Sequence, residues 1–190
     1  MQIIPVTYFE QPHPLVLGQY YEGGLVAYLT GSFPNQKAII VSMDWIGVRQ
    51  WGIYGQNLSA TSYDLFTGVT NTDLIIAADP TFDGAAKLAK NYNGSGYTDW
   101  CLPSADDLSV ICQNRDPYLL AANWNADGKG TWTSTQSVLG SPPVSSNFQA
   151  YEVVVGNGYS GCTPQGYTSK NQYDNVRPVR YVQMSANQQQ

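Results

Sequence analysis

The sequence carries little of what acid–base or nucleophilic catalysis requires. Its single histidine, His13, stands between two prolines near the N-terminus, where a catalytic triad could not be held in a fixed geometry. No nucleophile elbow, phosphate-binding loop or dinucleotide-binding fingerprint is present. Asp106 and Asp107 are the only adjacent carboxylates, and their position at the start of an expected helix favours interaction with the helix dipole. We therefore expect no enzymatic activity, with one alternative left open: a glycan hydrolase whose two carboxylates are distant in sequence.

One segment resembles the first half of a calcium-binding loop. The residues that match positions one, three, five and six of the EF-hand pattern are Asn123, Asn125, Asp127 and Gly128. Position twelve, which is a glutamate in that pattern, is Ser134 here, so a single carboxylate would face the ion. An ordinary turn of Asn, Asp and Gly is the preferred interpretation. The sequence predicts no metal and no cofactor.

Aromatic and amide side chains late in the chain favour molecular recognition. A stretch over residues 156–174, rich in glycine and tyrosine, is long for a strand connector. Tyrosine rings supply contact area, and Asn and Gln supply donors and acceptors for sugar hydroxyls. This stretch and the segment around Trp124 both flank expected strands, so they could converge at one end of a sheet; the open alternative is that they are ordinary surface loops. The candidate ligand-binding residues are Trp124, Asn125, Asp127, Asn157, Tyr159, Gln165 and Tyr167.

The composition excludes two classes of partner. The 190 residues include nine basic and fourteen acidic side chains, for a net charge of −5. A nucleic-acid or anionic-membrane binder needs a concentrated basic face, and the sequence has none. No apolar stretch approaches the roughly 18 residues of a membrane span, and residues 1–15 lack the pattern of a signal peptide. We expect no nucleic acid, no membrane insertion and synthesis in a cytosol.

The three cysteines fit that compartment. Cys101, Cys112 and Cys162 are an odd set without the close spacing of a zinc or redox site. We expect all three to be free thiols that are buried or partly buried.

The order of expected elements predicts an α+β protein. A hairpin is expected around residues 22–24, followed by a buried strand over 37–43 and irregular structure over 45–70. Asn71 and Asp83 are expected caps of two short helices, and Ser104 with Asp107 forms the capping box of a third. Strands return in the last third, so helices lie between two groups of strands. The expected elements of that central and last part are helices over 71–78, 84–92 and from 104, and strands over 130–135, 148–155 and 176–183.

Three parts of the chain are expected. Residues 1–16 form an N-terminal arm, interrupted by prolines yet apolar, which needs its own domain or a neighbouring subunit to lie on. Residues 17–184 form one domain, and residues 185–190 a flexible polar tail.

Three motifs resemble a known family. GYTDWCLPSADDL over residues 96–108, TWTST over 131–135 and VRPVR over 176–180 occur in this order. They resemble the C-type-lectin-like domain found at the C-terminus of bacterial collagen-like adhesins and in phage structural and tail-fibre proteins. Asp107 replaces the family's glutamate, and Thr131 replaces its first aromatic residue. The resemblance covers residues 17–183 and implies a C-type-lectin-like fold, with antiparallel strands and two to three short helices.

The motif residues are expected to build the fold. Trp100 and Trp132 would be core aromatics, and Asp99 would bond the backbone or an arginine. Arg177 and Arg180 are three residues apart in an expected strand, so they would point to opposite faces. We expect one of these arginines to be partnered inside the protein and the other to be exposed.

These observations together predict a phage virion protein, made in the host cytoplasm. Its C-type-lectin-like domain would attach to a host-surface glycan or protein, as part of a fibre or a capsid decoration. The arm would contact other virion proteins, and a homo-oligomer is expected. A purely structural or assembly component of the virion, without a ligand of its own, is the other non-enzymatic alternative.

Overall fold

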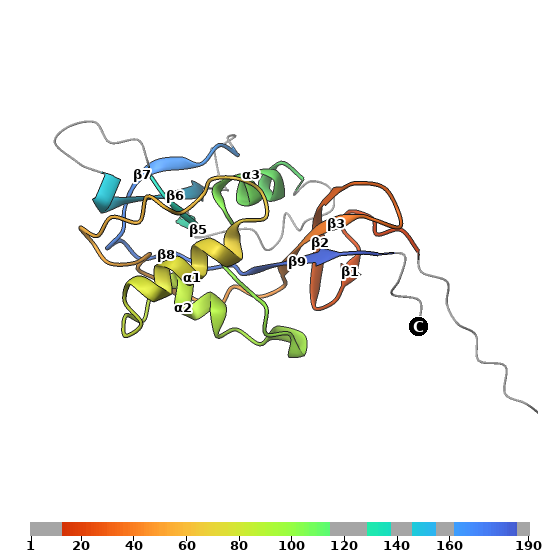
Figure 1. The fold of residues 1–190 in the computed structure, drawn as a ribbon, viewed down its shortest axis with the longest axis horizontal. Coiled ribbons are helices and arrows are strands. Elements are labelled where there is room, and N and C mark those ends of the chain that lie inside the picture. Colours follow the sequence, from red (N-terminus) through yellow and green to blue (C-terminus); the bar gives the residue numbers. More distant parts are fainter. Residues whose placement is uncertain (1–12, 115–128, 138–145, 155–161, 186–190) are drawn as a thin grey trace, which may run out of the picture.

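Two β-sheets lie side by side along the long axis of the molecule, with helices packed against them (Figure 1). The structure is a computed structural model that describes residues 13–114, 129–137, 146–154 and 162–185. Within these residues the protein is mixed α+β, as predicted, with largely antiparallel sheets and three α-helices.

The four-stranded sheet is antiparallel throughout, in the order β1-β2-β3-β9. The predicted hairpin is present, and its turn places Glu22 at φ 43° and Gly23 at φ 92°. A side chain at position 23 would also meet the Tyr97 ring at 2.9 Å, so this turn requires glycine. The strands are β1 (Tyr20–Tyr21), β2 (Gly24–Thr30), β3 (Lys37–Ser42) and β9 (Val179–Gln183).

The five-stranded sheet has the order β4-β8-β5-β6-β7, and its only parallel pair is β5 with β8. The late stretch over 156–174 was expected to be a loop, and this is wrong for its described part, which contributes the edge strand β7 and the start of β8. The strands are β4 (Val48–Arg49), β5 (Gly130–Gln136), β6 (Gln149–Val154), β7 (Gln165–Ser169) and β8 (Asp174–Asn175).

The helices are α1 (Gly68–Ala78), α2 (Ala85–Lys90) and α3 (Ala105–Gln113), with short 3-10 turns η1 (Gly94–Gly96) and η2 (Ser146–Phe148). The predicted capping box of α3 is confirmed, because Asp107 N donates to Ser104 Oγ and Ser104 N donates to Asp107 Oδ2. Two predicted caps are wrong. Asn71 lies inside α1, where its side chain exchanges hydrogen bonds with the Ser62 backbone, and Gly84 rather than Asp83 precedes α2.

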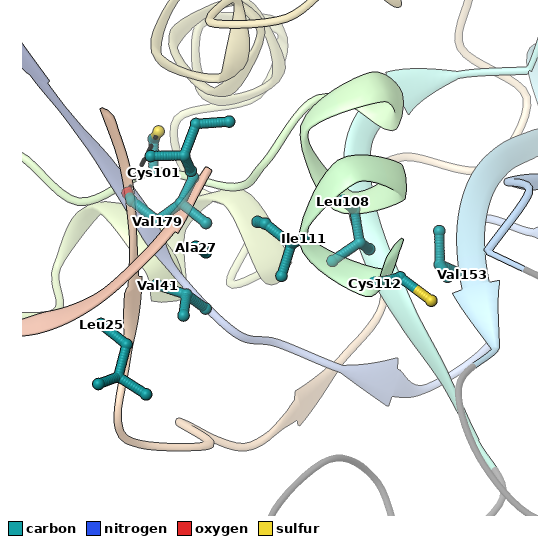
Figure 2. Packing of buried hydrophobic residues seen from close by; sticks show 10 residues of the cluster. Leu25, Ala27, Val41, Cys101, Leu108, Ile111, Cys112, Val153 and Val179 are labelled. Carbon is teal, nitrogen blue, oxygen red and sulfur yellow. Dashed lines mark hydrogen bonds between the residues drawn. The ribbon is translucent and has the colours of Figure 1, made fainter. Parts of the chain in front are cut away.

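The largest cluster of the core forms where α3 meets both sheets (Figure 2). The predicted inner stripe of α3 is confirmed: Leu108, Ile111 and Cys112 are all buried. These side chains pack against β2, β3 and β9 of one sheet and against Val153 of β6 in the other. The predicted core positions of Trp100 and Trp132 are also confirmed, since neither has exposed surface.

Only the end of the expected arm is described. Leu15 is 3% exposed, and its backbone N–H and C=O both bond the Gln36 side chain. The body of the protein thus includes Leu15, while residues 1–12 of the arm and residues 186–190 of the tail lie outside the described part.

Candidate recognition site

The register of the five-stranded sheet brings two predicted recognition segments to one end. Gly130, the first residue of β5, is the Cα partner of Val154, the last residue of β6. The segment with Trp124, Asn125 and Asp127 therefore joins the sheet beside the segment with Asn157 and Tyr159. Those five residues lie outside the described part of the chain, but the points where their segments join the sheet are neighbours.

Gln165 and Tyr167, the remaining candidates, belong to β7. Within the part of the chain that the structure describes, this strand pairs with β6 alone, and Gln165 is the Cα partner of Glu152, two residues from Val154. The first residue of β7 thus lies near the same end of the sheet. That end carries the joining points of both segments that the sequence analysis singled out.

A buried pair of carboxyl groups lies under this end. Glu152 on β6 and Asp174 on β8 are 8% and 1% exposed, and Asp174 is near enough to influence the pKa of Glu152. Burial raises the pKa of Glu152, against the opposing influence of the Thr168 hydroxyl and Asp174. Glu152 also packs on Gly130, where a Cβ would come within 1.6 Å of Oε2, so a larger residue there would displace the Glu152 carboxyl.

Glu152 is a charged residue within the apolar run of β6, and this break in the run was the sequence signal for a buried carboxyl. The described residues hold no group of three or more His, Cys, Asp or Glu side chains that could bind a metal ion.

Asp107 links three elements at the start of α3. Its Oδ1 accepts from Phe66 N at 2.8 Å, and its Oδ2 accepts from Ser104 N at 2.8 Å and from the Tyr181 hydroxyl. The Tyr181 oxygen in turn accepts from Gly68 N at 2.9 Å, at the start of α1. Burial raises the pKa of Asp107 despite these hydrogen bonds. This motif residue is therefore a structural junction that positions α1, α3 and β9.

The two motif arginines are both buried, so the expectation that one is exposed is wrong. Arg180 Nε and Nη2 donate to the two oxygens of Asp99 at 2.7 and 2.9 Å, which confirms the predicted bond from Asp99 to an arginine. Its guanidinium also lies 3.8 Å from the centroid of the Tyr97 ring. Arg177 Nε donates to Ser42 O at 3.0 Å, and its guanidinium lies 4.9 Å from the centroid of the Trp45 ring. Pro178 lies between them, and both sides of this segment face protein.

Lys170, just after β7, is a buried amine that the sequence analysis missed. It has no exposed surface, and its Nζ donates to Gln56 O at 2.7 Å and to Gln136 Oε1 at 2.6 Å. The amine also lies 4.8 Å from the centroid of the Trp51 ring. Burial lowers the pKa of Lys170 to about 8. Trp51 and Gln56 also line a shallow, solvent-open pocket with a cavity volume of about 10 Å³ between α1, α2 and the loop over 51–58.

This buried amine predicts a measurable pH dependence. Because the folded pKa of Lys170 lies below its ordinary value of 10.5, the unfolded chain binds more protons between these values. The free energy of unfolding should rise from about pH 8 to 10, by up to about 1.4 kcal/mol per pH unit. Denaturant unfolding at several pH values should show that the free energy of unfolding of Lys170→Met rises less steeply with pH than that of the parent. Lys87→Met, whose amine bonds Pro80 O on the surface, is the control and should keep the parent's slope; equal slopes for parent and Lys170→Met would contradict the assignment.

The expectation of three free thiols is wrong. Cys112 in α3 and Cys162 before β7 form a disulfide with 5.4 Å between their Cα atoms, and Cys101 alone is free and buried. Their separation of 50 residues gave no local signal, because a disulfide depends on how the fold brings distant positions together.

Comparisons with known proteins identify no relative: no family model, no curated protein and no solved structure matches the chain. Among the described residues, no helix has the length and apolar character needed to cross a bilayer.

Proposed function

We propose that this chain is a non-enzymatic phage virion protein, and that a C-type-lectin-like domain in it attaches to a glycan or protein on the host surface. The α+β architecture with short helices is compatible with that fold. The three motifs that resemble the family all occupy structural positions: the capping box of α3, the buried Trp132 on β5, and the buried Arg180 on β9. The motif residues named here therefore have structural roles in this chain.

The observation that carries the proposal is the pairing of Gly130 with Val154. It brings the joining points of two aromatic- and amide-rich segments together at one end of a sheet, near Gln165. Segments joined side by side can form one surface, and aromatic residues with amide neighbours suit sugars and protein surfaces. In this proposal the recognition residues are Trp124, Asn125, Asp127, Asn157, Tyr159, Gln165 and Tyr167.

Binding of the purified protein to intact cells of candidate hosts tests this function. Trp124→Ala, Tyr159→Ala and Tyr167→Ala should each keep the parent's melting temperature within a few degrees. At least one should weaken cell binding by roughly 1–3 kcal/mol, as expected for an aromatic hot spot. Tyr20→Ala, which removes a 57% exposed tyrosine from the other sheet, is the matched control and should bind as the parent does.

Two outcomes would contradict the proposal. If all three variants bind host cells as tightly as the parent, the recognition site is assigned wrongly. If the parent binds no candidate host, while particles that lack it fail to assemble, a purely structural role in the virion replaces attachment.

A further inference from the structure

The disulfide joins helix α3, which packs against several elements, to the start of the edge strand β7. Cys112 lies in the last turn of α3, is 1% exposed, and belongs to the core cluster in Figure 2. α3 contacts β2, β5 and β6, and its capping box fixes its first turn. Cys162 lies three residues before β7, an edge strand whose one strand neighbour among the described residues is β6. The covalent bond thus connects the start of an edge strand to the centre of the protein.

A hydrogen bond places Cys162 on the same helix. Ser109, one turn before Cys112, donates its hydroxyl to Cys162 O at 2.8 Å. The backbone and the sulfur of Cys162 therefore both contact α3. This arrangement keeps the two sulfurs close even before a bond forms, which favours rapid and repeatable closure.

The third cysteine does not compete for this bond. Cys101 has no exposed surface, and its thiol lies against Val179 O at 3.5 Å. Figure 2 shows it on the other side of the cluster from Cys112, which lies beside Val153. Burial also raises the pKa of Cys101, so little of the reactive thiolate forms there. Only one of the three possible pairings is available in this fold.

We propose that Cys112 and Cys162 form a redox-controlled clasp that fixes the start of β7 on α3. In a reducing cytosol the pair is held as two thiols. After release, a small-molecule disulfide takes up two electrons and two protons from the pair, leaves as two small thiols, and the Cys112–Cys162 bond forms. The clasp then fixes Gln165 and Tyr167 in place; this last step rests on the proposed function, while the closure itself does not.

The test uses the full chain after equilibration with oxidised glutathione or with reduced dithiothreitol. Maleimide labelling under denaturing conditions, read by mass spectrometry, should find one thiol in the oxidised protein and three in the reduced protein. Amide hydrogen exchange in residues 165–169 should become at least about tenfold faster on reduction, because an edge strand opens locally once its tether is removed. Exchange in β3 should stay unchanged. Binding to host cells should fall on reduction and return on reoxidation.

Two variants separate the clasp from other effects. Cys112→Ala/Cys162→Ala should resemble the reduced protein under both conditions. Cys101→Ala keeps the pair and should respond to reduction as the parent does.

Each outcome decides the proposal. Three thiols after oxidation, or equal exchange at 165–169 in both states, would overturn it, and so would faster exchange in β3 to the same degree, since that is global unfolding. Faster exchange at β7 with undiminished cell binding would overturn the control of recognition. If exchange responds as expected and the protein binds no host cell in either state, the clasp stands and the proposed attachment function fails.

Discussion

Asp107→Ala is expected to lower the free energy of unfolding by about 3–5 kcal/mol. The substitution removes the acceptor of the Phe66 N–H, the Ser104 N–H and the Tyr181 hydroxyl. Buried donors left without a partner cost about 1–3 kcal/mol each, and loss of one half of a capping box adds to this. Some relaxation keeps the total below the full sum. Urea unfolding followed by circular dichroism measures the change.

The adjacent carboxylate supplies the control for this experiment. Asp106 also lies in the first turn of α3 but is partly exposed, and no side-chain hydrogen bond to another element is seen for it among the described residues. Asp106→Ala should cost only a few tenths of a kcal/mol, the size of a helix-dipole contribution. If Asp107→Ala lowers the free energy of unfolding by as little as Asp106→Ala does, the hydrogen bonds of Asp107 contribute no more than a surface charge.

Arg180→Met is expected to cost about 2–4 kcal/mol. The side chain of Arg180 is 7% exposed, and it bonds both oxygens of Asp99 as well as the backbone and carboxylate of Glu22 in the β1–β2 turn. Breaking a buried ion pair leaves its partners without compensation. Because the Asp99 side chain is 53% exposed, water recovers part of this cost. The loss of the guanidinium from the Tyr97 ring adds to it.

Arg49→Met is the matched control for that measurement. Arg49 pairs with Asp83 at 3.4 Å, but the two side chains are 36% and 71% exposed. An exposed pair contributes between zero and about 1 kcal/mol, so this variant should melt close to the parent. If Arg180→Met also melts close to the parent, the hydrogen bonds of Arg180 do not stabilise the packing of the β1–β2 turn.

The features that sequence could predict are those with a local signal. The capping box of α3 spans four residues, and β3 is a run of β-branched residues, so both depend on neighbours in the chain. Trp100 and Trp132 were expected in the core because they belong to the short motifs that resemble the family, and both are buried. The α+β class followed from the order of these local elements.

The remaining features depend on which distant residues meet. Asn71 is a residue type that often caps helices, but it lies inside α1 and its side chain bonds the backbone of Ser62 instead. The proximity of Glu152 to Asp174, the burial of Lys170 among amides, and the bond between Cys112 and Cys162 each join separate elements. The hydrophobic periodicity and the composition of a sequence carry no information about which distant residues meet. The candidate recognition residues could be named from their types, whereas the pairing of Gly130 with Val154 required the structure.

The position of β9 has a consequence for the order in which the chain folds. Lys37 of β3 pairs with Gln183, so β3 has to wait for a strand that is synthesised much later. Contacts between such distant residues slow folding, and an unpaired strand edge exposed meanwhile favours aggregation. β3 carries Ile39, Ile40 and Val41 in succession. An apolar strand edge therefore stays unpaired until β9 has been synthesised, and the yield of native protein should depend on how fast the chain between β3 and β9 is translated.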